Sequence, residues 1–178
     1  SAREAVTEVL RKVREVLKRV EDENRKVSKE LRDLLEEVER RNRDLTEKVK
    51  RLIDELKERG RIDDKAVRDL EKLLEDNNRD VKRLLEEIDK LIKDNNKKVE
   101  KVLREIRRLL ERLEDVVDRG VDVERILEEA ERIVKELEEV LEESLRNVKE
   151  ILKKLEDALR KSEEDVRRIL ERVEEEAR

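Results

Sequence analysis

The sequence predicts an all-α fold, a long and nearly untwisted up-down-up bundle of three helices. Among the 178 residues, 57% are charged and only 2 are Gly, with no Pro and no aromatic residue, so almost nothing in the chain breaks a helix. The two glycines, Gly60 and Gly120, divide the chain into three segments of similar length. Within each segment the apolar residues recur with a helical period, which a disordered charged chain would lack.

The first helix is expected over residues 2–59. Ser1 and Glu4 have the S-x-x-E spacing of a capping box, in which each side chain satisfies a backbone donor of the first turn. At the other end, Arg59 places a cation near the helix C-terminus, and Gly60 can adopt the left-handed conformation just beyond it. These signals set both ends of the helix.

The second helix is expected over residues 64–119. Asp63 is a suitable N-cap because its carboxylate can accept a hydrogen bond from the first turn. Ile62 and Val67 flank this cap at the spacing of a hydrophobic staple. The connection from the first helix is therefore a short loop.

The third helix is expected over residues 123–177, after a second loop built in the same way. Gly120 ends the preceding helix, Asp122 serves as the N-cap, and Val121 and Ile126 form the staple. Such short loops require neighbouring helices to run antiparallel. We therefore expect a single domain.

The core positions repeat every 18 residues, as in the series Val67, Leu85 and Leu103. Eighteen residues over five turns is the period of a straight helix, so the apolar stripe should not drift around it. Each stripe covers roughly 120° to 140° of the helix circumference, at about 100° per residue. This width suits a closed three-helix core spanning residues 1–178, and it does not exclude a fourth helix.

Two Asn pairs in the second helix interrupt the apolar stripe. Asn77 and Asn95 occupy the position that Leu113 fills one repeat later, and Asn78 and Asn96 follow at the edge of the stripe. We therefore predict that the four amides point inward.

Antiparallel pairing also predicts the partners of these amides. Positions equally distant from Gly60 should face each other, which pairs Asn24 with Asn96 and Asn42 with Asn78. By the same reasoning about Gly120, Asn95 should face Ser144, and Asn77 should face Ser162.

The polar residues therefore define two layers, about 27 Å apart along the helices at 1.5 Å per residue. The first layer comprises Asn24, Ser28, Asn95, Asn96 and Ser144, with Asn147 as a further candidate. The second layer comprises Asn42, Thr46, Asn77, Asn78 and Ser162. An unpaired buried amide costs about 1–3 kcal/mol, so the members of a layer should hydrogen-bond one another. The alternative is that these Asn residues are exposed helix breakers or glycan acceptors, but none is followed by x-Ser or x-Thr.

Composition argues against catalysis and against most ligands. Without His, Cys or Tyr, only carboxylates and Lys remain as acids, bases or nucleophiles, and no Glu-x-x-His motif offers a di-metal site. A net charge of -5 with interspersed signs and no aromatic residue does not suit nucleic acid. No apolar run exceeds two residues, so no membrane span is expected. We expect no enzyme, cofactor, metal or small-molecule site, and a soluble protein compatible with cytoplasmic recombinant expression and without a natural location.

The Asp-capped Gly loops, the Leu, Val and Ile core and the layered Asn residues together resemble computationally designed helical bundles with buried hydrogen-bond networks. The resemblance covers the whole chain and implies a structural role, as a stable monomer, a defined oligomer or one side of a designed pairing. We hypothesise that the polar layers specify register, because a shifted core would leave several amides unpaired.

Two hypotheses about the function of the chain are consistent with these features. The first is a monomeric structural scaffold with no natural ligand. The alternative is a binding module or oligomer building block that packs against a partner helix or a copy of itself. The second reading is favoured by apolar residues at the margins of the stripes, namely Leu73, Leu91, Leu109, Leu127 and Leu145. Margin leucines can also simply thicken a closed core.

Overall fold

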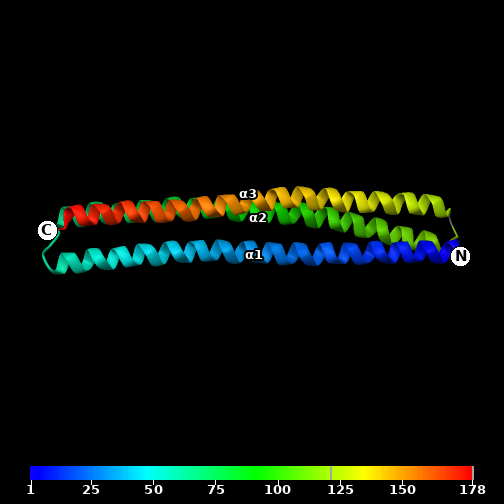
Figure 1. Cartoon of the computed structure of the whole chain (residues 1–178), viewed down its shortest axis with the longest axis horizontal. Coiled ribbons are helices and arrows are strands. Elements are labelled where there is room, and N and C mark those ends of the chain that lie inside the picture. The colour runs from blue at the N-terminus through cyan, green and yellow to red at the C-terminus, as the bar shows by residue number, and fades with distance from the viewer. Residues whose placement is uncertain (121, 178) are drawn as a thin grey trace. The chain divides into compact units, whose positions relative to one another are not determined.

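The structure, a computed structural model, describes residues 1–120 and 122–177. It contains the helices α1 (Ala2–Glu58), α2 (Asp64–Asp118) and α3 (Val123–Glu176), drawn in Figure 1. Within those ranges there is no strand. The predicted all-α class and helix order are confirmed, and each helix ends one residue earlier than expected. Val121, the first residue of the second predicted staple, lies outside the described residues.

The turn after α1 is a Schellman motif. The amide of Gly60 donates to the carbonyl of Lys57 at 3.0 Å, and the amide of Arg61 donates to the carbonyl of Leu56 at 2.9 Å. Gly60 has φ +65°, a left-handed conformation that Gly adopts without a Cβ clash. Gly120 has φ +77° and donates to the carbonyl of Val117 at 3.2 Å, so each of the two helices is followed by a left-handed Gly that donates to the carbonyl three residues earlier.

The N-termini of the helices are capped by the predicted residues. Oγ of Ser1 accepts from the amide of Glu4 at 3.3 Å, and Oδ1 of Asp63 accepts from the amide of Ala66 at 2.8 Å. Oδ1 of Asp122 accepts from the amide of Glu124 at 3.1 Å. Each cap satisfies a backbone donor that the helix itself leaves free.

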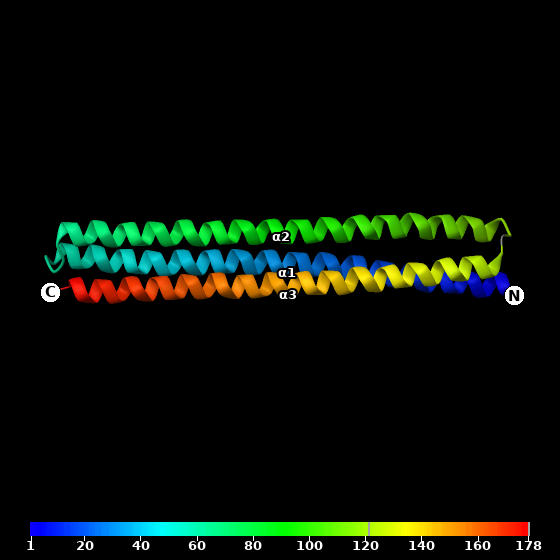
Figure 2. The same cartoon turned by 90° about the horizontal axis from the view of Figure 1, so that it is seen from above.

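The chain forms two compact units, and the boundaries between them fall within the helices. Unit 1 comprises Ser1–Glu30 and Ile92–Glu150, and unit 2 comprises Leu31–Leu91 and Ile151–Arg178. Each unit therefore contains one segment of every helix. Within unit 1, Figures 1 and 2 show the three segments side by side in two perpendicular views.

Ion pairs in unit 1 establish the antiparallel arrangement of α1 and α2. Arg14 binds Glu114 through two hydrogen bonds of 2.9 Å, and Glu21 binds Arg107. Residue numbers rise along α1 as they fall along α2, which is the direction that the short loop after Gly60 requires.

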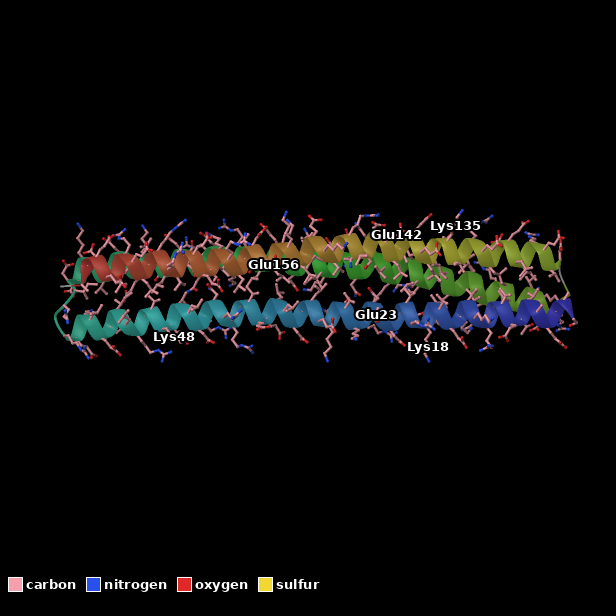
Figure 3. All side chains as sticks on the ribbon, in the orientation of Figure 1. Lys18, Glu23, Lys48, Lys135, Glu142 and Glu156 are labelled. Carbon is pink, nitrogen blue, oxygen red and sulfur yellow. The ribbon has the colours of Figure 1, made fainter. Side chains whose placement is uncertain are left out.

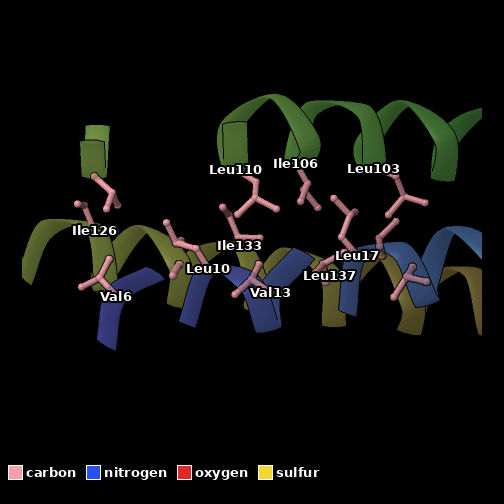
Figure 4. Packing of buried hydrophobic residues seen from close by; sticks show 14 of the residues in the cluster. Val6, Leu10, Val13, Leu17, Leu103, Ile106, Leu110, Ile126, Ile133 and Leu137 are labelled. Atoms are coloured by element: carbon pink, nitrogen blue, oxygen red, sulfur yellow. The ribbon is translucent and has the colours of Figure 1, made fainter. Parts of the chain in front are cut away.

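The core of unit 1 draws on all three helices. In Figure 4, Leu103, Ile106 and Leu110 extend from α2 toward side chains of α1 and α3. The buried cluster consists of Val6, Leu10, Val13, Leu17, Val20, Val99, Leu103, Ile106, Leu110, Val117, Ile126, Ala130, Ile133, Leu137 and Val140. Burying each large side chain of this kind contributes about 1.5–3 kcal/mol, so this cluster is the main stabilising feature of the unit.

The core of unit 2 includes the staple of the first loop. Ile62 and Val67 are 6% and 3% exposed, so the cap at Asp63 is held against the apolar interior. The buried cluster consists of Val49, Ile53, Ile62, Ala66, Val67, Leu70, Leu74, Val166, Ile169 and Val173. The staple thus joins the loop to the packing of all three helices.

Charged side chains project from the outer faces of the helices. Figure 3 labels six of them, Lys18, Glu23, Lys48, Lys135, Glu142 and Glu156. Several ion pairs join residues three or four apart on one helix, such as Arg43 with Glu39 and Arg132 with Glu129. Exposed pairs of this kind contribute only about 0.2–0.5 kcal/mol each, so they solubilise the surface more than they specify the fold.

Candidate functional site

The candidate site is the set of polar residues that interrupts the apolar core. The first polar layer lies wholly within unit 1 and the second polar layer wholly within unit 2. Six of these residues are buried, namely Ser28, Asn42, Thr46, Asn77, Asn95 and Ser162. Because water cannot reach them freely, their hydrogen-bond partners must come from the protein.

Asn96 joins α1 to α2 in the first polar layer. Its Oδ1 accepts hydrogen bonds from Nδ2 of Asn24 at 3.0 Å and from Oγ of Ser28 at 3.1 Å. Its Nδ2 donates to Oε1 of Glu100, one turn further along α2, at 3.3 Å. The predicted pairing of Asn24 with Asn96 is therefore present, and the amide oxygen uses both of its acceptor sites.

Asn95 joins α2 to α3 in the same layer. Its Oδ1 accepts from Nδ2 of Asn147 at 2.9 Å, and its Nδ2 donates to Oγ of Ser144 at 3.4 Å. The predicted pairing with Ser144 is present as the longer of these two contacts, and Asn147, proposed as a further candidate, makes the shorter one. Adjacent residues of α2 thus bind different neighbouring helices.

Asn42 links all three helices in the second polar layer. Its Nδ2 donates to Oδ1 of Asn78 at 3.0 Å, which is the predicted pairing between α1 and α2. Its Oδ1 accepts from Oγ of Ser162 on α3 at 2.6 Å. Asn42 is 5% exposed and Ser162 is fully buried, so these contacts form away from water.

Asn77 and Ser162, which were predicted to face each other, do not hydrogen-bond to each other. Ser162 donates to Asn42 instead, while Nδ2 of Asn77 donates to Oδ2 of Asp165 at 3.0 Å. Asp165 also forms an ion pair with Lys161 at 3.2 Å. A carboxylate is a stronger acceptor than a hydroxyl, which favours this exchange of partners. It leaves Oδ1 of Asn77 buried without a hydrogen-bond partner.

Two other members of the second layer differ from the expectation. The hydroxyl of Thr46 donates to the carbonyl of Arg43 on its own helix at 3.0 Å, so this contact satisfies the side chain locally. Asn78 was expected to point inward from the edge of the apolar stripe. The residue is instead exposed, although its Oδ1 accepts the hydrogen bond from Asn42. An open groove of about 420 Å³ lies beside it, lined in part by Leu35 and Leu85.

Sequence reasoning missed Asp165, although the repeat contained a signal for it. Asp165 follows Asn147 by 18 residues, just as Ser162 follows Ser144. Asn147 and Asp165 therefore lie on the same face of α3. Asn147 binds Asn95, and Asp165 binds Asn77. Extending every polar position by one repeat would have identified Asp165 as a position in the second layer, although not as the partner of Asn77.

The chemistry of both layers is that of neutral amides and hydroxyls. Such groups donate and accept hydrogen bonds, but they do not gain or lose protons near neutral pH. Among residues 1–120 and 122–177, no group of three or more acidic side chains is placed to hold a metal ion. What the arrangement provides is directional contact between helices.

In the part of the chain that the structure describes, no helix has the length and apolar character needed to cross a membrane. No protein-family model matches the chain, and neither a curated protein nor a solved structure is detectably similar to it.

Proposed function

We propose that this protein is a designed structural scaffold without natural catalytic or ligand-binding activity, whose register is specified by its two polar layers. The observation that carries the proposal is the position of Asn42. One buried amide binds Asn78 on α2 and Ser162 on α3 at the same time. A contact of this kind depends on the axial position of all three helices, which apolar packing alone specifies poorly.

The physical basis is the difference between apolar and polar partners. If a helix slipped along its neighbours, one Leu would meet another Leu or Val at little cost. Slippage at a polar layer would instead place Asn opposite Leu, and each buried amide left unpaired would cost about 1–3 kcal/mol. The layers would then select one register by destabilising the others.

The test replaces six of the seven interhelical amides, Asn24, Asn42, Asn77, Asn78, Asn95 and Asn96, with Leu or Ile. We expect the thermal stability of this variant to stay equal or increase, because apolar replacements of buried polar groups are often neutral or stabilising. We also expect several oligomeric species in place of one, measured by size-exclusion chromatography with light scattering. A control variant replaces six exposed Lys residues with Gln and should leave the oligomer distribution of the parent unchanged.

If the six-Asn variant remains as homogeneous as the parent, the layers do not specify register. A large loss of thermal stability would also contradict the proposal, since it would make the amides stabilising contacts in their own right.

We propose as a second candidate a binding module that packs against a further helix. The observation that favours it is a set of large apolar side chains at least 36% exposed, among them Leu141 at 43% and Leu145 at 56%. Light scattering tests self-association: a multiple of 21.5 kDa supports a building block for oligomers. A mass of 21.5 kDa is expected both for the scaffold and for a module that binds a partner chain, and binding of an added helix separates these two.

A further inference from the structure

A groove runs between α1 and α3 in unit 1. It has a volume of about 210 Å³ near the first polar layer, where Val20 and Val27 of α1 face Leu141, Leu145 and Val148 of α3. Its walls are therefore mainly aliphatic. The groove differs from the closed core beneath it, because several of the side chains along it are open to solvent.

The exposed apolar side chains of unit 1 are not scattered. In the described part of this unit, the large apolar residues with the highest exposure are Val16 on α1 and four residues of α3, namely Leu127, Val134, Leu141 and Leu145. Those on α3 are spaced by seven, seven and four residues, so they form one line along the helix surface. The line spans 18 residues, about 27 Å at 1.5 Å per residue. A line of this length and spacing matches the apolar stripe of another helix.

Polar contacts cross the other two seams of unit 1, a seam being the interface between two neighbouring helices. The seam between α1 and α2 contains the Arg14–Glu114 ion pair and the Asn24–Asn96 hydrogen bond. Across the seam between α2 and α3, Asn147 donates to Asn95. Within the described residues of unit 1, no hydrogen bond or ion pair joins α1 to α3. The groove therefore lies along the seam that polar contacts leave open.

The surface of α3 beside the apolar line, which continues from the groove toward the start of the helix, is acidic. Residues 124–143 contain nine Glu and only three basic residues, Arg125, Arg132 and Lys135. Glu131 and Glu138 stand four residues after Leu127 and Val134, which places them beside the apolar line on the helix surface. Both carboxylates belong to exposed residues. On the α1 side, the exposed residues Lys12 and Arg19 flank Val16, and Glu23 lines the groove itself.

We propose that the groove between α1 and α3 of unit 1 binds one amphipathic helix of a partner chain, whose aliphatic stripe carries Lys or Arg along the edge against α3. This inference rests on the second proposed function and adds the chemistry of the partner. The exposed apolar line buries against the stripe, and the Glu row pairs with the basic edge. A second copy of the chain is a poorer occupant, because symmetric pairing through this groove brings two acidic margins into one interface.

The test uses two synthetic helices of about 25 residues, long enough to cover the apolar line at 1.5 Å per residue. Both carry the same Leu and Ile stripe and one Trp, and they differ only in having Lys or Glu along the edge meant for α3. The protein contains no Trp, Tyr or Phe, so the fluorescence of the probe reports binding without interference. We expect the Lys probe to bind at least about tenfold more tightly than the Glu probe, with the difference shrinking in high salt.

Two protein variants locate the binding site. Replacing Leu141 and Leu145 with Glu should weaken binding of the Lys probe by about tenfold or more, since it puts charge into the apolar contact. The matched control is Leu91→Glu on α2, a substitution at a similarly exposed Leu, 36% exposed in the parent, and it should leave binding unchanged. Circular dichroism of each variant checks that the helices are intact.

A charge-reversal pair tests the acidic margin. The triple variant Glu131→Lys, Glu138→Lys and Glu142→Lys should reverse the preference between the two probes. The matched control changes the net charge equally at exposed acidic positions of α2, through Asp94→Lys, Glu111→Lys and Asp115→Lys.

The outcomes separate this inference from the function on which it rests. If the Glu probe binds as tightly as the Lys probe, the groove still binds helices and the charge assignment is overturned. If neither probe binds at about 100 μM, the level of a weak helix contact, both the inference and the second proposed function fail. If the protein is itself a dimer that Leu141→Glu with Leu145→Glu dissociates, the occupant is a second copy and the inference is overturned.

Discussion

The side-chain amide of Asn77 donates to the carboxylate of Asp165 at 3.0 Å, while the oxygen of the same amide is buried without a partner. Asn42, in the same polar layer, uses both its donor and its acceptor. The two residues are nearly equal in burial, at 2% and 5% exposed, so they differ mainly in how well their hydrogen bonds are satisfied.

Replacing each of these amides with Leu should therefore have opposite effects on stability. Asn77→Leu removes a buried unpaired acceptor, and we expect it to raise the free energy of unfolding by about 1 kcal/mol. As a single substitution, Asn42→Leu leaves its partners Asn78 and the fully buried Ser162 without their contact, and we expect a loss of about 1–3 kcal/mol. In the six-Asn variant this loss is offset, because Asn42 and Asn78 are replaced together. Denaturant unfolding followed by circular dichroism measures both values. A loss at Asn77 equal to that at Asn42 would contradict this account of the layer.

The turn at Gly60 should be sensitive to backbone strain and insensitive to crowding. A Cβ at this position would meet nothing within 4 Å, but φ is +65°. We expect Gly60→Ala to lower the free energy of unfolding by about 1–2 kcal/mol, the cost of the left-handed conformation for an L-residue. Gly60→Asn should cost less, because Asn tolerates that conformation better than Ala. Thermal unfolding of the two variants would reveal equal losses if strain were not the cause.

Leu137 and Leu145 are eight residues apart on α3 but differ in environment, at 1% and 56% exposed. We expect Leu137→Ala to lower the free energy of unfolding by about 2–5 kcal/mol, because it removes packing contacts and leaves a cavity. Leu145→Ala should change the free energy of unfolding of the isolated chain by no more than about 0.5 kcal/mol, since it alters only an exposed side chain. Chemical unfolding in the absence of any partner checks this contrast. A large loss at Leu145 would mean that it packs against something in solution.

Glu8 provides a local pH response. The hydrogen bond from Arg11 lowers the pKa of its carboxyl below the ordinary value of 4.5, chiefly by stabilising the charged form. Because the folded-state pKa is depressed, the contribution of the pair is present above the ordinary value and is lost as pH falls through the folded-state pKa. In an NMR titration we expect the pKa of the Glu8 carboxyl to lie below 4.5 in the parent and to rise in Arg11→Gln. Equal titration in both proteins would exclude Arg11 as the cause.

Local sequence signals were sufficient to predict the helices and, to within one residue, their ends. Gly60 and Gly120 are the positions where the backbone needs a left-handed residue, and Ser1, Asp63 and Asp122 are the caps that follow from short-range hydrogen bonding. These features involve residues only a few positions apart. They do not depend on what the rest of the chain does.

Interhelical contacts were predictable only where the turn geometry sets them. The pairs Asn24–Asn96 and Asn42–Asn78 follow from their equal distances to Gly60, because one tight turn fixes the alignment of α1 with α2. The partner of Ser162 did not follow from distance to a turn. It donates to Asn42 rather than interacting with Asn77, since a side chain where three helices meet can reach either neighbour.

The sequence by itself therefore determined the all-α class, the ends of the three helices and which faces carry apolar or polar residues, because periodicity and capping are local. Only the tertiary structure decided that Asp165 replaces Ser162 as the partner of Asn77 and that Thr46 is satisfied within its own helix. It also decided that Leu137 is buried while Leu145, on the same apolar stripe, is exposed. Each of these outcomes depends on how each helix is rotated about its axis against its neighbours, a quantity that packing sets and helical period does not.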